Sequence, residues 1–149
     1  MLQKTWISND PIQTKLIAQR LAEHIHERTI ITLQGDLGSG KTTFTQGLAK
    51  GLGITKNVNS PTFTISKIYE GRLDLIHIDA YRLENESSDL GFEEFFDMNM
   101  VSVIEWPKYI SDILPLERID IMIEILDETS RCFTFTYDTI YTELLEVIQ

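Results

Sequence analysis

The spacing of apolar residues along this 149-residue chain alternates between two periods, and each period predicts one kind of element. Residues 29–33 and 101–105 are continuous apolar runs rich in β-branched side chains, which are typical of buried strands. Later in the chain, apolar residues alternate with other residues, turn at residues 127–130 and alternate back. This pattern predicts an antiparallel hairpin with one buried face, formed by Ile119, Ile121, Ile123, Ile125, Phe133, Phe135 and Tyr137.

Three segments repeat apolar residues at helical spacing. In the first, Asp10 is the expected N-cap and Pro11 the first helical residue, and the helix is expected to run to about Glu27. Its expected core-facing residues are Ile12, Leu16, Ile17, Leu21 and Ile25. The other two predicted helices cover residues 43–52 and 139–149, and the last one is expected to turn inward Ile140, Leu144 and Ile148.

Shorter elements account for the remaining residues. Residues 3–7 predict a short strand, and residues 65–70 and 73–81 predict a hairpin around the turn at Gly71 and Arg72. Residues 83–99 combine carboxylates with aromatic side chains, which predicts one or two short helices packed by their aromatic residues. We interpret the charges of that segment as a solvated face rather than a site.

A phosphate-binding pattern stands between the strand at residues 29–33 and the helix at residues 43–52. The run Gly35-Asp36-Leu37-Gly38-Ser39-Gly40-Lys41-Thr42 matches GxxxxGK[ST] in full, in the strand–loop–helix context that confirms the motif. Glycines let backbone N–H groups approach phosphate oxygens, and the helix N-terminus adds its positive dipole end. A glycine-rich turn without a ligand is the alternative, but it leaves the matching flanks unexplained. The sequence therefore predicts a nucleoside triphosphate site.

The motif also predicts the fold and the roles of two side chains. Lys41 can bridge the β- and γ-phosphates, and the Thr42 hydroxyl can bind Mg²⁺. With the strands above, we expect an α/β, P-loop NTPase-like fold of three layers. Its mixed central sheet would carry two antiparallel hairpins, with helices on both faces. Residues 1–149 are expected to form a single domain.

Two apolar strands are expected to end in a carboxylate, Asp79 in one case and Glu105 in the other. The carboxyl end of a strand is where an open α/β sheet delivers ligands to a phosphate site. In phosphate-loop enzymes a buried strand of this kind ends in an acidic residue that holds Mg²⁺, directly or through water. Glu105 fits that role, the alternative being a solvent-exposed glutamate at a strand end. Asp79 could be a metal ligand or a base.

Composition narrows the classes of partner. The formal net charge is -10 and no Lys/Arg cluster occurs, which disfavours direct binding of nucleic acid, although the charge could also serve solubility alone. Residues 1–10 lack the apolar run of a signal peptide, and no apolar run approaches the roughly 18 residues that cross a bilayer. Cys132 is the single cysteine, so an internal disulfide is impossible. We expect a cytoplasmic protein without a membrane partner.

Four segments in order resemble the TsaE (formerly YjeE) family over roughly the whole chain. They are the phosphate loop through Thr43, Ser60-Pro61-Thr62-Phe63-Thr64, His77-Ile78-Asp79-Ala80-Tyr81-Arg82-Leu83, and Glu105-Trp106. The resemblance implies an ATP- and Mg²⁺-dependent ATPase of tRNA threonylcarbamoyladenosine synthesis at position 37. It also implies weak intrinsic turnover, TsaD and TsaB as protein partners, and hydrolysis that resets their complex. Contact with tRNA would be indirect, through that complex.

The resemblance also implies site residues. The phosphates would be held by Gly35, Gly38, Ser39, Gly40, Lys41, Thr42 and Thr43. Thr42 and Glu105 would bind Mg²⁺, Asp79 would position water or the metal, and Thr62 would sense the γ-phosphate. The family's base-side positions correspond to Gln13 and Arg131, although Ser130 stands where a glycine is expected before Arg131. Trp106 could lie beneath the nucleotide or at a partner surface.

Three other functions fit the sequence less well. A small-molecule kinase generally needs an arginine-bearing lid for the transferring phosphoryl group, and the arginines here are few and scattered. A GTPase switch would carry the base-reading NKxD pattern, which is absent. A scaffold with a vestigial nucleotide site would not need the intact Lys41, Thr42, Asp79 and Glu105.

Overall fold

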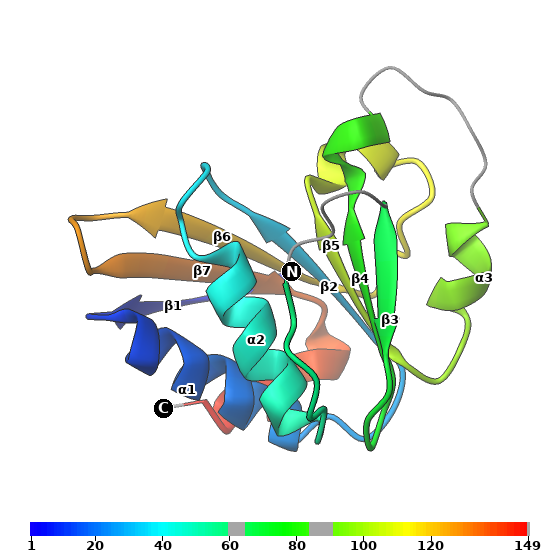
Figure 1. Ribbon diagram of the computed structural model, residues 1–149, viewed down its shortest axis with the longest axis horizontal. Coiled ribbons are helices and arrows are strands. Elements are labelled where there is room, and N and C mark those ends of the chain that lie inside the picture. Colours follow the sequence, from blue (N-terminus) through cyan, green and yellow to red (C-terminus); the bar gives the residue numbers. More distant parts are fainter. Residues whose placement is uncertain (60–64, 84–90, 149) are drawn as a thin grey trace.

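A seven-stranded sheet forms the centre of the computed structural model, which describes residues 1–59, 65–83 and 91–148 (Figure 1). The strand order is β1-β7-β6-β2-β5-β4-β3. The strands are β1 (Leu2–Ser8), β2 (Thr29–Gln34), β3 (Ser66–Tyr69), β4 (Leu75–Asp79), β5 (Val101–Glu105), β6 (Ile119–Ile125) and β7 (Arg131–Tyr137).

The sheet is mixed, as the sequence predicts. Strand β2 is parallel to both of its neighbours, β5 and β6, and β4 is parallel to β5. The two predicted hairpins are confirmed as the antiparallel pairs β3–β4 and β6–β7. Strand β1 adds a third antiparallel pair at the edge beside β7, over seven residues rather than the short strand expected. Four strands, β4, β5, β2 and β6, therefore run parallel, and three of them, β4, β5 and β2, end level with one another where β2 leads into the phosphate loop.

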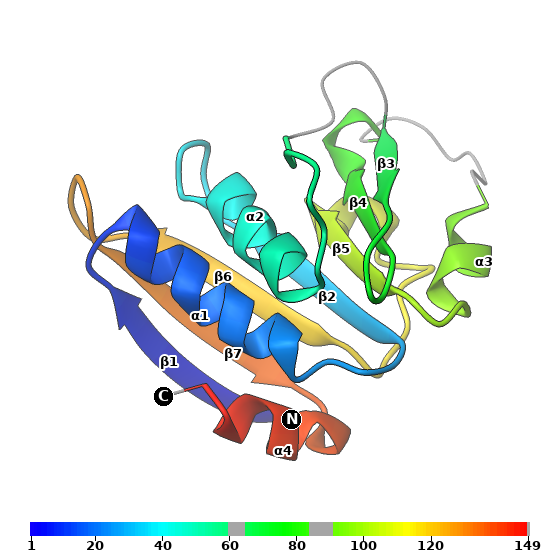
Figure 2. The same cartoon turned by 60° about the horizontal axis from the view of Figure 1, so that its bottom comes forward.

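Apolar side chains from alternate strand positions form two cores, one on each face of the sheet. Helices α1 (Pro11–Glu23) and α2 (Lys41–Gly51) lie side by side over one face (Figure 2). The other face is covered over β2, β5 and β4 by α3 (Phe92–Phe96) and by two 3-10 turns, η1 (Ala80–Leu83) and η2 (Pro107–Ile110). The predicted three-layer α/β arrangement with helices on both faces is therefore confirmed.

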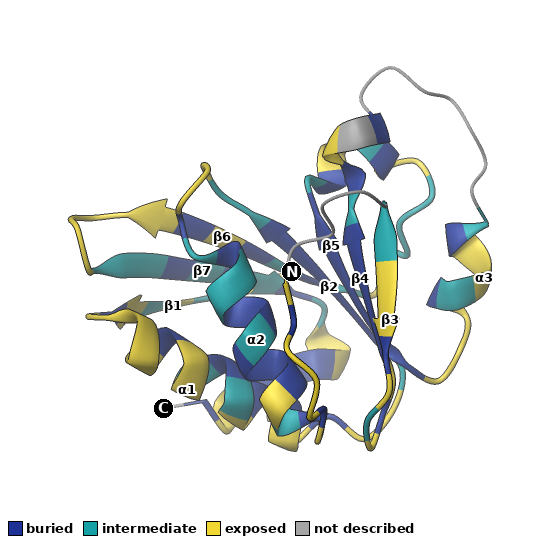
Figure 3. Cartoon of the chain, in the orientation of Figure 1, coloured by how far each residue is buried: buried dark blue, intermediate teal, exposed yellow. Residues whose placement is uncertain are grey.

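The buried face of α1 differs from the one that apolar spacing predicts. Ile12 is 72% exposed and Leu16 is 48% exposed, and the helix ends at Glu23 rather than near Glu27 (Figure 3). The predicted core residues Leu21 and Ile25 are buried and Ile17 packs against the core, while the helix also buries Thr14, Ala18 and Ala22. The reason lies in α2, which presents Gly47 and Gly51 to α1. A Cβ atom on Gly47 would lie 2.8 Å from Ala18 Cβ, so the two helices are too close for larger side chains along this line.

The other deviations are at element ends. The predicted strand 73–81 is shortened to β4, which passes directly into the turn η1. The predicted helix 139–149 is a 3-10 turn, η3 (Thr139–Tyr141), followed by α4 (Thr142–Glu146). As predicted, Ile148 is buried and Leu144 packs against the core, whereas Ile140 is 58% exposed and Tyr141 and Leu145 are buried. Ile140 lies in the 3-10 turn, where each residue rotates by more than in an α-helix, so its side chain does not follow the α-helical spacing.

The acidic segment follows the solvated interpretation where it is described, and the region just after α1 is exposed at His24 and His26. In α3 and the turn after it, Glu93, Glu94 and Asp97 are exposed, whereas Phe92 and Phe96 are buried. Residues 84–90 lie outside the described residues. His24 Nδ1 bonds to the carbonyl of Arg20 at 2.9 Å in the last turn of α1. In the described ranges, no helix is long and apolar enough to cross a membrane.

Candidate nucleotide-binding site

The phosphate loop connects the carboxyl end of β2 to the first residue of α2, Lys41. Two of its glycines have positive φ angles, 81° at Gly38 and 106° at Gly40, a conformation that other residues adopt only with strain. Gly40 caps α2 without a side-chain hydrogen bond to the first turn. The start of this helix therefore carries no side-chain cap from Gly40, and a helix N-terminus that follows a glycine loop is a common binding place for anions.

Gly35 and Ser39 are packed against each other at the base of the loop. A Cβ atom on Gly35 would lie 2.6 Å from Ser39 Oγ and 2.7 Å from the carbonyl oxygen of Ile123, so this position has room for glycine alone. The hydroxyl of Ser39 is buried and has no hydrogen-bond partner among the described residues. A buried polar group usually has a partner, and an anion in the loop is one that this hydroxyl could bind.

Lys41 folds its side chain back over the loop. Its ammonium donates to the carbonyl oxygen of Gly35 at 2.6 Å and lies 4.3 Å from the centre of the Trp106 ring. The residue is only 8% exposed, and no carboxylate forms an ion pair with it in the part of the chain that is described. A buried ammonium held by one carbonyl and one aromatic face has hydrogen-bond capacity left for an anionic ligand.

The two acidic strand ends meet beside the loop. Because β5 lies between β2 and β4, Glu105 pairs with Leu33 on one side and Asp79 on the other. Asp79 accepts a hydrogen bond from the backbone N–H of Tyr81 at 3.1 Å. Glu105 is 5% exposed and bonds to His77 Nε2 at 2.5 Å, which excludes the alternative of a solvated glutamate. The structure thus brings Lys41, Asp79 and Glu105 to one edge of the sheet.

A magnesium ion would depend on the nucleotide for most of its ligands. Among the residues described, no group of three or more His, Cys, Asp or Glu side chains is placed to hold a metal. Mg²⁺ is commonly held by one or two protein oxygens, phosphate oxygens and water. Thr42, in the first turn of α2, and Glu105, at the end of β5, offer two such oxygens, and this donor set suits Mg²⁺.

A second part of the site lies between the loop, the start of α1 and the β6–β7 turn. These segments enclose a cavity of about 240 Å³, lined by Pro11, Thr14, Gly38, Ser39, Gly40, Thr43, Glu128, Thr129 and Arg131. Arg131 donates from Nε to the carbonyl of Ser39 at 3.0 Å and from Nη2 to that of Gly38 at 3.2 Å. Arg131, expected on the base side, is therefore brought against the phosphate loop.

Gln13 is placed differently from Arg131. Its side-chain oxygen accepts from the backbone N–H of Asn9 at 2.6 Å, and its own N–H donates to Asp10 at 2.8 Å, so it helps to cap α1. It lines a groove other than the 240 Å³ cavity. Its neighbour Thr14, which was not among the predicted site residues, lines that cavity instead. A polar residue on a buried helix face is the only signal, and apolar spacing does not detect it.

The β6–β7 turn needs no glycine before Arg131. Trp106 is the one non-glycine residue with a positive φ in the described ranges, so Ser130 lies in an ordinary conformation. Asp127 orders the turn by accepting from the N–H of Ser130 at 2.7 Å and of Thr129 at 2.9 Å. These backbone hydrogen bonds lower the pKa of the Asp127 carboxyl from its ordinary value. The expected glycine is thus replaced by an aspartate-ordered turn.

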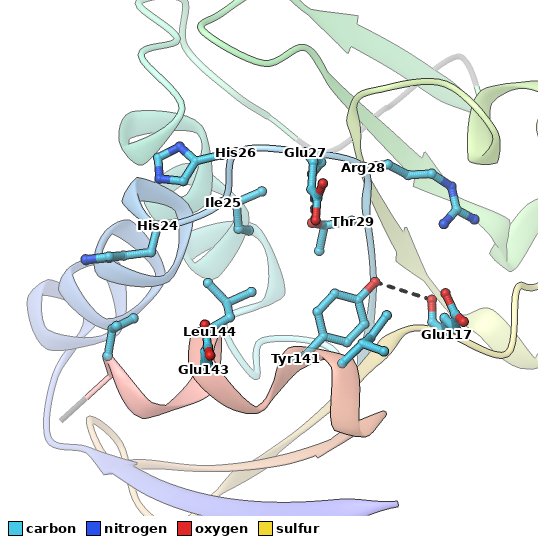
Figure 4. Close-up of a pocket in the computed structure, with 12 residues that line it drawn as sticks. His24, Ile25, His26, Glu27, Arg28, Thr29, Glu117, Tyr141, Glu143 and Leu144 are labelled. Carbon is cyan, nitrogen blue, oxygen red and sulfur yellow. Dashed lines mark hydrogen bonds between the residues drawn. The ribbon is translucent and has the colours of Figure 1, made fainter.

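Thr62 falls outside the described residues, so its predicted role stays a prediction. A cavity of about 580 Å³ lies at the amino end of β2, between residues 24–29 and the segment that carries Tyr141 and Leu144 (Figure 4). Tyr141 donates to the carbonyl of Glu117 there at 3.4 Å, and burial raises its pKa. The length of β2, roughly 17 Å, separates this cavity from the phosphate loop.

Known proteins resemble the chain in sequence and in fold. The family model for "Threonylcarbamoyl adenosine biosynthesis protein TsaE" matches residues 8–133. A Bacillus subtilis (strain 168) relative, named tRNA threonylcarbamoyladenosine biosynthesis protein TsaE, is 49% identical over 137 residues, which cover 91% of this chain and 87% of the relative. A relative of the same name from Treponema pallidum (strain Nichols) is 40% identical over 112 residues, covering 74% of this chain and 83% of the relative.

The crystal structure of YdiB from Bacillus subtilis matches with a TM-score of 0.86 at 40% sequence identity. The match covers 99% of this chain and 94% of that one. Sequence and fold therefore agree, and the chain belongs to the TsaE family, with its P-loop NTPase-like fold.

Proposed function

We propose that this protein is the ATP-hydrolysing component of the machinery that makes N6-threonylcarbamoyladenosine at position 37 of tRNA. One observation carries the ATPase part of the proposal. The β2–β5–β4 register aligns Glu105 and Asp79 beside the strand that leads into the phosphate loop. A phosphate cradle with acidic strand ends next to it is the arrangement with which phosphate-loop enzymes hydrolyse nucleoside triphosphates.

The chain's own groups would act mainly by positioning and by charge. The backbone N–H groups of the loop and of the first turn of α2 would hold the β-phosphate. The Lys41 ammonium would leave the carbonyl of Gly35 for the β- and γ-phosphate oxygens, where it neutralises developing charge. Thr42 and Glu105 would hold Mg²⁺, which when bound supplies further neutralisation of the phosphates.

Asp79 is the group that would orient the attacking water. It follows the same register as Glu105 but is partly exposed, and one oxygen already accepts from the backbone N–H of Tyr81. That hydrogen bond fixes the carboxylate while leaving acceptor capacity for a water molecule. Glu105, which is buried, would be the metal ligand of the pair. In this division of roles the partly exposed Asp79 binds the water molecule and the buried Glu105 binds the cation.

The partner proteins would supply the contact with tRNA. The net charge of -10 makes the surface a poor match for a polyanion, so we propose that TsaD and TsaB hold the tRNA and that this protein docks on them. The relatives are named for threonylcarbamoyladenosine biosynthesis, which supports a role for this chain in that process, with TsaD and TsaB as the partners we propose. Hydrolysis would be slow alone, stimulated by the partners, and would reset the complex between rounds.

ATP turnover by the purified protein, alone and with TsaB and TsaD from the same organism, tests the proposal. We expect slow, Mg²⁺-dependent release of phosphate that rises when both partners are present. The Lys41→Ala variant is the negative control for contaminating ATPases. Brisk turnover that ignores both partners, or transfer of the phosphoryl group to a small molecule, would overturn the proposed function.

A further inference from the structure

His77 makes a short side-chain contact with Glu105, one of the two carboxylates at the strand ends. It lies on β4 opposite Val103, two pairs before the Asp79–Glu105 pair and on the same face of the sheet, and it is 0% exposed. Its Nε2 atom lies 2.5 Å from Glu105 Oε2, and the Glu105 side chain is 6% exposed. Neither residue lies at the surface, so solvent does little to screen or loosen this contact.

The other ring nitrogen shows how the imidazole is used. His77 Nδ1 is buried and has no hydrogen-bond partner among the residues the structure describes. An imidazole protonated on both nitrogens would bury an unpaired N–H donor there, which is costly. With the proton on Nε2, only a lone pair at Nδ1 is left without a partner. The geometry therefore favours a His77 ring that donates from Nε2 to Glu105 Oε2.

We propose that His77 is the positioning residue for Glu105. A glutamate side chain has several rotamers, and a hydrogen bond at Oε2 selects one of them and ties down one oxygen. The second oxygen then remains for the cation that Glu105 and Thr42 are proposed to hold. Groups that hold metal ligands in this way commonly affect metal affinity or activity by about 10–100-fold. This inference rests on the proposed function, because it concerns how Glu105 meets Mg²⁺.

Two substitutions separate positioning from packing. His77→Gln keeps an N–H donor near the place of Nε2, whereas His77→Leu fills similar space without a donor. We expect His77→Leu to weaken Mg²⁺-dependent ATP binding and turnover by about 10–100-fold and His77→Gln to recover most of the loss. A matched control is Ser102→Ala, which also alters a buried, unpartnered polar side chain on a central strand but faces the other core. It is expected to leave turnover unchanged.

A role in packing alone predicts a different result. Thermal unfolding would then shift in both His77 variants, while turnover per folded molecule would stay at the wild-type level in both, and the inference would be wrong. Nitrogen NMR of the imidazole gives a readout independent of activity. We expect one protonated nitrogen, Nε2, in the nucleotide-free protein, and a proton on Nδ1 would contradict the assignment.

The two proposals fail in distinguishable ways. If the wild-type protein neither binds Mg²⁺·ATP nor hydrolyses it, the proposed function is wrong, and the role of His77 toward a cation falls with it. If the wild-type protein does both and His77→Leu does so equally well, the ATPase proposal stands and the positioning role of His77 is wrong.

Discussion

The ammonium group of Lys41 lies 4.3 Å from the centre of the Trp106 ring, at the point where the phosphate loop meets the end of β5. Trp106 reaches this place with a φ of 58°, immediately before Pro107. Such a backbone conformation costs a non-glycine residue of order 1–3 kcal/mol and persists only where the surroundings impose it. Tyr81 supports the indole from the other strand end, with ring centres 5.2 Å apart. The Lys41 ammonium therefore rests against an aromatic surface in this structure.

Replacing Lys41 by alanine is expected to remove most of the affinity for ATP while the fold persists. Hydrogen bonds to charged groups contribute about 1.5–3 kcal/mol, so affinity should fall by about 10–150-fold. Calorimetric titration with ATP and Mg²⁺ measures the loss, and circular dichroism checks the fold. Lys50→Ala, an exposed change on the same helix, is the matched control. Equal ATP affinity in the Lys41 variant and the control would contradict the site.

Changing Glu105 to glutamine is expected to affect the metal rather than the nucleotide. The amide oxygen can still accept from His77, so the fold is retained, but the carboxylate charge that attracts Mg²⁺ is lost. ATP binding without Mg²⁺ should match the wild type, and the gain on adding Mg²⁺ should shrink. Glu105→Ala should show the same loss of Mg²⁺-dependent binding.

The matched control for Glu105 is Glu93→Gln, which removes one exposed carboxylate from α3. This control alters the net charge by the same amount as Glu105→Gln, but the substituted residue lies outside the site. A wild-type response to Mg²⁺ in both Glu105 variants would remove Glu105 from the metal site.

Asp127 is expected to make the β6–β7 turn sensitive to acid. Its pKa in the folded protein is lowered from 3.8 by hydrogen bonds from Ser130 and Thr129. A lowered pKa contributes stability that is present above pH 3.8 and is lost as pH falls through the folded value. The stability difference between the wild type and Asp127→Ala should therefore narrow in acid. Urea unfolding across this pH range measures it.

Glu124→Ala is the control for that series, since Glu124 is an exposed carboxylate on β6. The stability difference between Glu124→Ala and the wild type should depend on pH far less than that of Asp127→Ala. A constant difference between wild type and Asp127→Ala at every pH would show that the turn does not depend on the ionised carboxylate.

Gly47→Ala is expected to destabilise the protein although alanine is the better helix former. Helix propensity alone would favour alanine by about 1 kcal/mol. The added Cβ, however, would lie 2.5 Å from the carbonyl oxygen of Lys15 and 2.8 Å from Ala18 Cβ. Overpacking of this kind costs about 1–3 kcal/mol, so the free energy of unfolding should fall. Urea unfolding measures it, with Lys50→Ala as an exposed control on the same helix. A stabilised variant would mean that α1 and α2 move apart easily.

The phosphate loop was predictable from sequence because its structure depends on its own backbone. Positive φ angles require glycine at Gly38 and Gly40, and these requirements appear directly in the residue types. The strands on either side were predictable for the same local reason. The adjacency of Asp79 and Glu105 could not be predicted, because it depends on the strand order. The residues of the strands do not indicate that β5 lies between β2 and β4.

The buried face of α1 was mispredicted at Ile12 and Leu16, because burial there also depends on a neighbouring element. Periodicity identifies apolar residues, but the partner of a helix decides which of them fit. Since α2 offers glycines at the contact, Ala18 and Ala22 pack there, and the larger Ile12 and Leu16 are left exposed. The role of Arg131 needed tertiary structure as well, because it contacts residues more than ninety positions earlier in the chain.

Among the strands that the structure describes, β1 pairs with β7 alone, from Leu2 opposite Tyr137 to Ser8 opposite Arg131. A ribosome adds about 5–20 residues per second, so these partners emerge on the order of ten seconds apart. During that interval the nascent chain already carries the phosphate loop, but neither the edge strand nor the Arg131 hydrogen bonds to Gly38 and Ser39 can form. Competence to hold a nucleotide should therefore arise late in synthesis, when the β6–β7 hairpin closes on the first strand.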